Sequence, residues 1–121
     1  MREIKFRGKC TDDGLWRHGD LLHENGLLWI NDNGLHCTVD ENTVGQYIGL
    51  DDKNGKNIYE GDIVKCDTFV YEVTRSKRFA SFCLKRKQDM FLHYFGEAVE
   101  AKDVEVIGNL HDDQQLKYLY G

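Results

Sequence analysis

The sequence lacks the features of a membrane-spanning, exported or repeat protein. No apolar run approaches the roughly 20 residues that cross a bilayer. Charged residues interrupt the N-terminal segment from Arg2 to Lys9, so it has no signal-peptide core. No internal repeat, low-complexity tract or long linker is present. With 121 residues, the chain is expected to form one soluble domain in the cytoplasm.

The cysteine spacing gives no sign of a metal site. None of the four cysteines forms a Cys-x-x-Cys pair, which is the usual arrangement in structural zinc sites. Without an export signal, the simplest interpretation is four free thiols. A zinc site shared with the histidines would need the fold to gather these residues, so we expect no metal and no cofactor. The cysteines are Cys10, Cys37, Cys66 and Cys83.

Common catalytic and ligand-binding motifs are also missing. There is no glycine-rich phosphate loop and no Gly-x-Ser-x-Gly elbow. A calcium loop starting at Asp51 would need glycine at position six and glutamate at position twelve, where Lys56 and Asp62 stand. The paired acids lie in predicted turns, where carboxylates cap the local backbone. We therefore expect no catalytic residue and no enzymatic activity.

The pattern that is present consists of short apolar runs separated by turn dipeptides. Asp13-Gly14, Asn25-Gly26, Asn33-Gly34 and Asn54-Gly55 are strong hairpin signals. They predict strands at 4–7, 16–23, 27–31, 35–39 and 44–50, an antiparallel meander. Fourteen aromatic residues can supply a core, and Trp16 and Trp29 are expected to pack within it or on the sheet.

The second half continues in the same way. Strands are predicted at 63–66, 69–74, 79–84, 90–95 and 104–110, and they suggest a small partly open barrel of the Src-homology-3 (SH3) type. Asp112-Asp113 can cap a short C-terminal helix. The predicted fold is all-β, with a β-meander portion at 1–45, a small barrel at 46–110 and a helix or tail at 111–121.

The central segment, residues 49–65, carries the most specific pattern, Gly-Leu-Asp-Asp-Lys-Asn-Gly-Lys-Asn-Ile-Tyr-Glu-Gly-Asp-Ile-Val-Lys. Asn54 and Gly55 are expected to take the two positive φ angles of a type I′ turn. Gly61 is expected to let the chain turn sharply before the β-branched pair Ile63-Val64.

This segment resembles the signature of the YopX family of small phage and prophage proteins. Flanking runs resemble the same family in order: Met-Arg-Glu-Ile-Lys-Phe-Arg-Gly at 1–8, Gly-x-Trp-x-x-Gly-Asp-Leu at 14–21, Thr-Val-Gly-Gln-Tyr-x-Gly-Leu at 43–50 and Val-Ile-Gly-Asn at 106–109. The chain departs from the family in having no proline and in showing little of its pattern at 66–101. The family has no established biochemical activity, so the resemblance implies a fold and a genomic context.

One segment stands out by its charge. Positions 75–87 hold six basic residues and no acid, whereas the rest of the chain has a formal charge of −11. Basic groups beside aromatic rings can bind phosphates and stack bases. The favoured alternative is a solvated strand pair whose lysines protect a sheet edge, because overall acidity opposes nonspecific nucleic-acid binding. The candidate face comprises Arg75, Lys77, Arg78, Phe79, Phe82, Lys85, Arg86 and Lys87.

The leading functional hypothesis is an uncharacterised phage or prophage accessory protein that acts as a non-enzymatic protein-interaction module. The alternative is single-stranded nucleic-acid binding through the basic face at 75–87. A protein partner is expected, a homo-oligomer is a further option, and no membrane association is expected. A contiguous apolar surface patch would favour a protein partner, whereas exposed Phe79 or Phe82 beside basic groups would favour nucleic acid.

Overall fold

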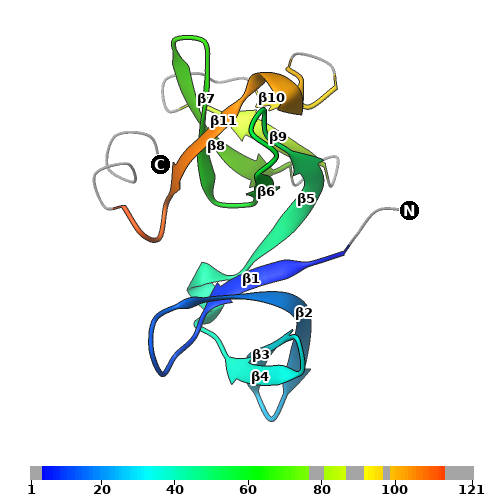
Figure 1. The fold of residues 1–121 in the computed structure, drawn as a ribbon, viewed down its shortest axis with the longest axis vertical. Helices are drawn as coiled ribbons and strands as arrows, with labels where there is room; N and C mark the ends of the chain where they lie inside the picture. Colours follow the sequence, from blue (N-terminus) through cyan, green and yellow to red (C-terminus); the bar gives the residue numbers. More distant parts are fainter. Residues whose placement is uncertain (1–3, 77–80, 87–91, 97–98, 114–121) are drawn as a thin grey trace. The chain divides into compact units, whose positions relative to one another are not determined.

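A computed structural model of the chain describes residues 4–76, 81–86, 92–96 and 99–113. Its contacts group the chain into two compact units, residues 1–49 and 50–121. The described residues form antiparallel strands and two short 3₁₀ turns (Figure 1), which confirms the predicted all-β class. Each unit is described by itself below.

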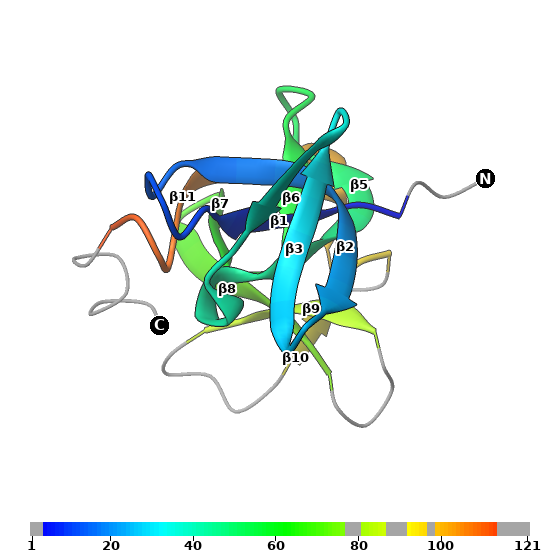
Figure 2. The ribbon, with the colours of Figure 1, turned by 90° about the horizontal axis from the view of Figure 1, so that it is seen from below.

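The first unit is the predicted meander. Its strands lie side by side in the order β4-β3-β2-β1-β5, and the long β2–β3 hairpin is plain in Figure 2. Strand β5 continues across the boundary between the units. The elements are β1 (Phe6–Lys9), β2 (Trp16–Glu24), β3 (Leu27–Asp32), β4 (Leu35–Thr38), the turn η1 (Glu41–Thr43) and β5 (Gly45–Asp51).

Two of the predicted tight turns set the pairing register of β2, β3 and β4. Asn25 and Gly26 have φ angles of 55° and 74°, and Asn33 and Gly34 have φ angles of 52° and 90°. Two consecutive positive φ angles are what a type I′ hairpin requires, and asparagine followed by glycine adopts them at least cost. The prediction of these two hairpins is confirmed.

The core of the first unit lies on one face of its sheet. Ile30 is fully buried, with Cys37 opposite it on β4 and Leu21 opposite it on β2. A bridge between Cys10 and Val39 joins the end of β4 back to the end of β1, so the sheet curls around this face. The residues at the alternate positions of these strands therefore lie on the opposite, outward face.

The second unit contains a five-stranded antiparallel sheet in the order β10-β9-β8-β7-β11. In the described residues these pairings do not close into a barrel, and the likeness to a partly open barrel of the SH3 type stays a prediction. The short helix predicted to follow Asp112-Asp113, at residues 114–118, lies outside the described part of the chain. The elements are β6 (Asn57–Tyr59), β7 (Asp62–Cys66), β8 (Phe69–Arg75), β9 (Phe82–Lys85), β10 (Leu92–Tyr94), the turn η2 (Ala101–Asp103) and β11 (Glu105–Asn109).

The turn at Asn54-Gly55 differs from the prediction. Gly55 has a φ of 80°, but Asn54 does not have a positive φ, so the type I′ assignment is wrong. The amide of Gly55 donates to the carbonyl of Asp52 (3.0 Å), and the amide of Asp52 donates to the carbonyl of Lys56 (2.8 Å). This is a three-residue loop with glycine in the left-handed position. The Asp52 side chain selects it, because its Oδ1 accepts from the amides of Asn54 (2.8 Å) and Lys56 (2.9 Å).

The same aspartate fastens this loop to the edge of the five-stranded sheet. Asp52 Oδ2 accepts from the amide of Val106 in β11 (2.9 Å), and the amide of Lys53 donates to the carbonyl of Val104 (2.9 Å). Three backbone hydrogen bonds hold the pKa of the Asp52 carboxyl below its ordinary value, although burial by itself raises it. The most distinctive part of the sequence is thus a structural clamp.

Candidate functional site

The structure describes half of the predicted basic face. Arg75, Phe82, Lys85 and Arg86 are placed, whereas Lys77, Arg78, Phe79 and Lys87 lie outside the described residues. Strand β9, which carries Phe82 and Lys85, lies between β8 and β10. The idea that these lysines protect a sheet edge is therefore wrong for Lys85, because its strand is paired on both sides.

Arg75 and Phe82 form one of two contacts between a guanidinium and an aromatic ring that involve β8 of the five-stranded sheet. They are opposite each other on β8 and β9, and the Arg75 guanidinium lies 5.0 Å from the centre of the Phe82 ring. A carboxylate oxygen of Glu60 lies 3.7 Å from the same guanidinium. The charge of Arg75 is therefore partly balanced within the protein.

A second contact of this kind lies at the other end of β8. The Arg86 guanidinium is 4.3 Å from the centre of the Phe69 ring, and 49% of Phe69 is exposed. Tyr71 follows on the same face of β8, and its ring meets the ring of His93 edge-on at 5.5 Å. We call Phe69, Tyr71 and Arg86 the Arg–aromatic platform. The alternation on β8 already places Phe69 and Tyr71 together, but their link to Arg86 depends on strand register.

The two contacts do not form one continuous stripe. Val73 and Leu84 lie between them on the same face and are fully buried. Lys85 lies on the opposite face, across from Glu72. Burial raises the pKa of the Glu72 carboxyl, and the charge of Lys85 offsets only part of that rise. The predicted basic segment is therefore divided between two faces and two ends of the sheet.

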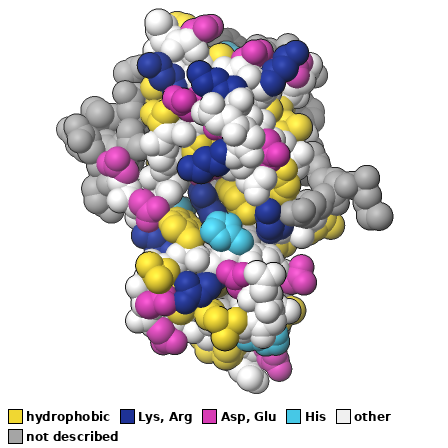
Figure 3. Space-filling model, viewed as in Figure 1, with side chains coloured by type: hydrophobic (Ala, Val, Ile, Leu, Met, Phe, Trp, Pro, Cys, Tyr) yellow, Lys and Arg dark blue, Asp and Glu magenta, His cyan; other side chains and the backbone are white. Residues whose placement is uncertain are grey.

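Carboxylates lie close to the Arg–aromatic platform. Cys66 is opposite Phe69 in the register of β7 and β8, and burial raises the pKa of its thiol, with Asp67 and Asp103 adding to the rise. These acids reduce the attraction of the platform for phosphate. Figure 3 likewise shows basic, acidic and apolar side chains interspersed on the face that it presents.

The outward face of the first unit carries an apolar patch that the sequence analysis did not identify. Leu22 on β2 lies directly opposite Trp29 on β3, and Leu27 is two residues earlier on the same face as Trp29. Leu27 is 52% exposed, and the Trp29 indole is oriented by its donation to the carbonyl of Glu24 (3.1 Å). We call Leu22, Leu27 and Trp29 the Trp29 patch. It lies on the opposite face of β3 from the buried Ile30.

Trp16 has a different environment. The Arg7 guanidinium lies 4.6 Å and the Lys9 ammonium 5.5 Å from its ring centres. The two cations come from alternate positions of β1, opposite the start of β2. The ring therefore packs on its own sheet, as predicted for Trp16.

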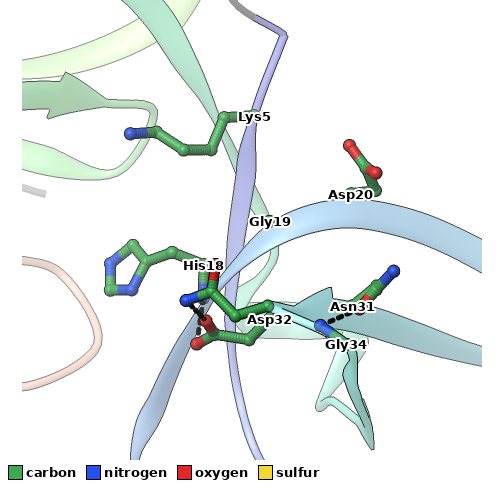
Figure 4. Close-up of a pocket in the computed structure, with 8 residues that line it drawn as sticks. Lys5, His18, Gly19, Asp20, Asn31, Asp32 and Gly34 are labelled. Atoms are coloured by element: carbon green, nitrogen blue, oxygen red, sulfur yellow. Dashed lines mark hydrogen bonds between the residues drawn. The ribbon is translucent and has the colours of Figure 1, made fainter.

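A polar pocket of about 460 Å³ also lies in the first unit (Figure 4). Asp32 accepts from the His18 amide (3.3 Å), and Asn31 accepts from the Gly34 amide (2.8 Å). The Lys5 and His18 side chains extend in the same direction, away from Asn31 and Gly34. Burial, followed by the charge of Arg7, lowers the pKa of His18. The pocket is lined by Lys5, His18, Gly19, Asp20, Asn31, Asp32, Asn33 and Gly34.

The described part of the chain shows neither a metal-binding cluster nor a membrane-spanning helix. No group of three His, Cys, Asp or Glu side chains lies in an arrangement that could hold a metal ion there. All four cysteines are free. None of the described elements is a helix of the length and apolarity needed to cross a membrane.

Comparison with known proteins identifies the family. The YopX protein family matches residues 5–116, nearly the whole chain, so the chain belongs to the YopX family. The structure is similar to the crystal structure of protein EF1440 from Enterococcus faecalis, with a TM-score of 0.59 and 21% sequence identity, over 96% of this chain and 99% of that chain. At this identity the likeness shows a shared fold. No curated protein matches the chain.

Proposed function

We propose that this YopX protein is a non-enzymatic accessory protein of phage or prophage origin that acts through protein contacts in the bacterial cytoplasm. The observation that carries the proposal is the Trp29 patch. It combines an oriented indole with two leucines on the face of a sheet whose other face forms the core. Tryptophan in such a setting is typical of the residues that dominate protein interfaces.

The physical reason is the cost of leaving this patch in water. Burial of apolar surface stabilises a complex by about 25 cal/mol per Å², and an already oriented indole loses little conformational entropy on binding. The backbone around Glu24 is exposed and polar, which suits the rim of an interface. A protein partner can therefore bury the leucines and the indole while the rim stays hydrated.

The test compares two leucines of similar exposure. Leu27 is 52% exposed and belongs to the patch, whereas Leu15 is 60% exposed and lies before β2, outside it. The wild-type protein, Leu27→Ser and Leu15→Ser are used to capture partners from nuclease-treated host lysate. Each captured protein is then purified and its affinity measured. We expect at least a tenfold loss of affinity for Leu27→Ser and little change for Leu15→Ser. Equal affinities of all three would refute the proposal.

Single-stranded nucleic-acid binding is the second candidate, and the Arg–aromatic platform favours it. A half-exposed phenylalanine beside a guanidinium offers one group to stack on a base and another to contact phosphate. The overall charge of −5 and the nearby Asp67 and Asp103 oppose it. For this reason it stands second to the protein partner.

The sheet provides a matched control for this candidate. Arg86 belongs to the platform, and its sequence neighbour Lys85 is on the opposite face. Binding of a labelled oligothymidine is measured over a range of salt concentrations. If nucleic acid binds here, Arg86→Gln should reduce the slope of log affinity against log salt concentration by the equivalent of about one phosphate contact. Phe69→Ala should weaken binding by about 1–3 kcal/mol. Lys85→Gln should change neither. Two results would exclude the platform as a nucleic-acid binding site. One is no binding at low salt, and the other is an equal loss of affinity in Lys85→Gln and Arg86→Gln.

A further inference from the structure

The strands that carry the Trp29 patch come from a stretch of sequence that contains no lysine or arginine. Residues 18–52 include seven acidic residues and no basic ones, so their formal charge is −7. The rest of the chain has 16 basic and 14 acidic residues and a formal charge of +2. The patch therefore belongs to a strongly acidic part of a chain that is otherwise close to neutral.

Two of these acids lie on the same face of β2 as the patch. Side chains alternate along a strand, so Asp20 and Glu24 share the face of Leu22. Both acids are exposed. At about 3.3 Å per residue, each lies roughly 6.6 Å from Leu22 along the strand, and the two are about 13 Å apart. Leu22 therefore has an acid on each side of it.

The two carboxylates have no cation directly across the sheet. Asn31 is opposite Asp20, and Leu27 is opposite Glu24. Lys5 lines the same pocket as Asp20, but its side chain extends away from that acid (Figure 4). The negative charge on this face is therefore available to a partner.

We propose that this face binds an extended partner segment in which a basic, an apolar and a second basic residue occupy alternate positions. The inference rests on the proposed function, because it specifies what the Trp29 patch binds. Alternate side chains of an extended segment are about 6.6 Å apart on one side, so the three match Asp20, Leu22 and Glu24 in order. The apolar side chain then contacts the patch, and each basic group meets a carboxylate.

The pattern points to a different protein as the occupant. The chain itself has no segment of this kind, because its one pair of basic residues four positions apart, Lys5 and Lys9, has Arg7 between them. The same acids repel phosphate, so this face is unsuited to nucleic acid. A basic segment of a partner protein is therefore the occupant that the charges favour.

Arginine suits the position beside Glu24 better than lysine does. The Trp29 indole N–H donates to the carbonyl of Glu24 (3.1 Å), so the ring lies beside that residue. A guanidinium can stack on an aromatic ring and bind a carboxylate through two parallel hydrogen bonds, whereas an ammonium is a compact and strongly hydrated charge. We therefore expect arginine in at least one of the two basic positions.

The partner segment lies over the sheet and does not extend it. The outer edge of β4 is paired by the chain's own residues 9–11: the amide of Thr11 donates to the carbonyl of Thr38 (3.0 Å), and the amide of Asp40 donates to the carbonyl of Lys9 (2.9 Å). The hydroxyls of Thr11 and Thr38 lie 2.6 Å apart. Binding therefore depends on side chains, and their spacing is what the experiment varies.

The test uses a synthetic peptide, Thr-Arg-Thr-Leu-Thr-Arg-Thr, in which the arginines have the proposed spacing. One control, Thr-Arg-Arg-Leu-Thr-Thr-Thr, has the same composition with adjacent arginines, and the other has glutamate in place of both arginines. Binding to the wild-type protein at low salt is followed by the NMR signal of the Trp29 indole N–H. We expect the first peptide to bind about two- to fivefold more tightly than the control with adjacent arginines, because that control loses one ion pair. The glutamate control should not bind.

Two double variants with the same change in charge test the acids. Asp20→Asn with Glu24→Gln removes both carboxylates of the proposed site, whereas Glu41→Gln with Asp67→Asn removes two exposed acids outside β2. The first double variant should weaken binding of the arginine peptide about tenfold and reduce its salt dependence, and the second should change little. Equal losses in both double variants, equal binding of the two arginine peptides, or no binding to the wild type would each overturn the inference.

The captured partner separates this inference from the proposed function. A partner whose affinity falls in Leu27→Ser but not in the variant of Asp20 and Glu24 leaves the Trp29 patch as the interface and excludes a basic segment. A partner that is insensitive to Leu27→Ser contradicts the proposed function, whatever the peptides do. A wild-type dimer in sedimentation that dissociates in the Asp20 and Glu24 variant would assign the face to a second copy and also overturn the inference.

Discussion

Asp52 offers the sharpest test of how the family signature acts in this chain. Only 6% of the residue is exposed, and its carboxylate accepts hydrogen bonds from the backbone N–H groups of Asn54, Lys56 and Val106 at 2.8–2.9 Å. Replacing it with alanine removes all three acceptors at once. The matched control is Asp51→Ala, because Asp51 is the adjacent acid in the sequence but is exposed.

The expected loss follows from where the three donors lie. Asn54 and Lys56 are exposed, so water replaces the carboxylate and each bond costs about 0.5–1.5 kcal/mol. Val106 is half-buried at the sheet edge, and its unpaired amide costs about 1–3 kcal/mol. The total for Asp52→Ala is about 2–6 kcal/mol, centred near 4, which lowers Tm by roughly 15 °C in a chain of this size. Asp51→Ala should change stability by less than about 0.5 kcal/mol.

The assay must report on the second unit. Both tryptophans lie in residues 1–49, so their fluorescence follows the first unit. Calorimetry and far-ultraviolet circular dichroism follow both units, and exchange of the Val106 amide reports the edge directly. An Asp52→Ala protein as stable as Asp51→Ala would refute the clamp.

Acid should weaken the same clamp. The folded-state pKa of Asp52 lies below its ordinary value of 3.8, because three N–H bonds outweigh the effect of burial. The group therefore contributes stability that is fully present above about pH 3.8 and is lost as the pH falls through the folded-state pKa. The stability difference between wild type and Asp52→Asn should narrow over that acid range in denaturant titrations. A difference independent of pH would contradict this assignment.

Three further predictions concern turns, close packing and thiols. Gly55→Val should lower the free energy of unfolding by about 1–3 kcal/mol, because the backbone φ of 80° is strained for valine. The space around a Cβ at this position is open, so no clash contributes, and an unchanged Tm would contradict the prediction. Gly19→Ala should destabilise the first unit, because its Cβ would clash with the backbone carbonyl oxygen of Asn31; a variant as stable as the wild type in tryptophan-monitored unfolding would show that the strands can separate to make room. Titration with a thiol reagent in denaturant should find four reactive groups, and fewer would indicate a bond or modification at Cys10, Cys37, Cys66 or Cys83.

Local chemistry was enough to predict most of the strands. Asn25-Gly26 and Asn33-Gly34 have few alternatives to a type I′ turn, and the alternating residues on either side fix the register. The predicted strand at 16–23 corresponds to β2 (Trp16–Glu24), and the predicted strand at 69–74 corresponds to β8 (Phe69–Arg75). The resemblance to the YopX family, which the match over residues 5–116 confirms, pointed to the same all-β fold.

The turn at Asn54-Gly55 shows where local chemistry was insufficient. The same dipeptide adopts a different turn here because the Asp52 carboxylate binds two amides of the loop and one amide of β11. Val106 is 54 residues away in sequence. No local propensity can anticipate that partner, so only the tertiary structure decided the geometry of the signature segment.

The candidate surfaces depended on the tertiary structure in the same way. The sequence determined that positions 75–87 are basic, but strand alternation and register placed Arg86 beside Phe69 and Lys85 on the other face. It also determined the two turns that bracket β3, whereas the pairing of Leu22 with Trp29 follows from which strands became neighbours. Composition and turn chemistry act within a few residues and therefore fix the elements. Surfaces are made by side chains from different strands, so they exist only once the sheet has formed.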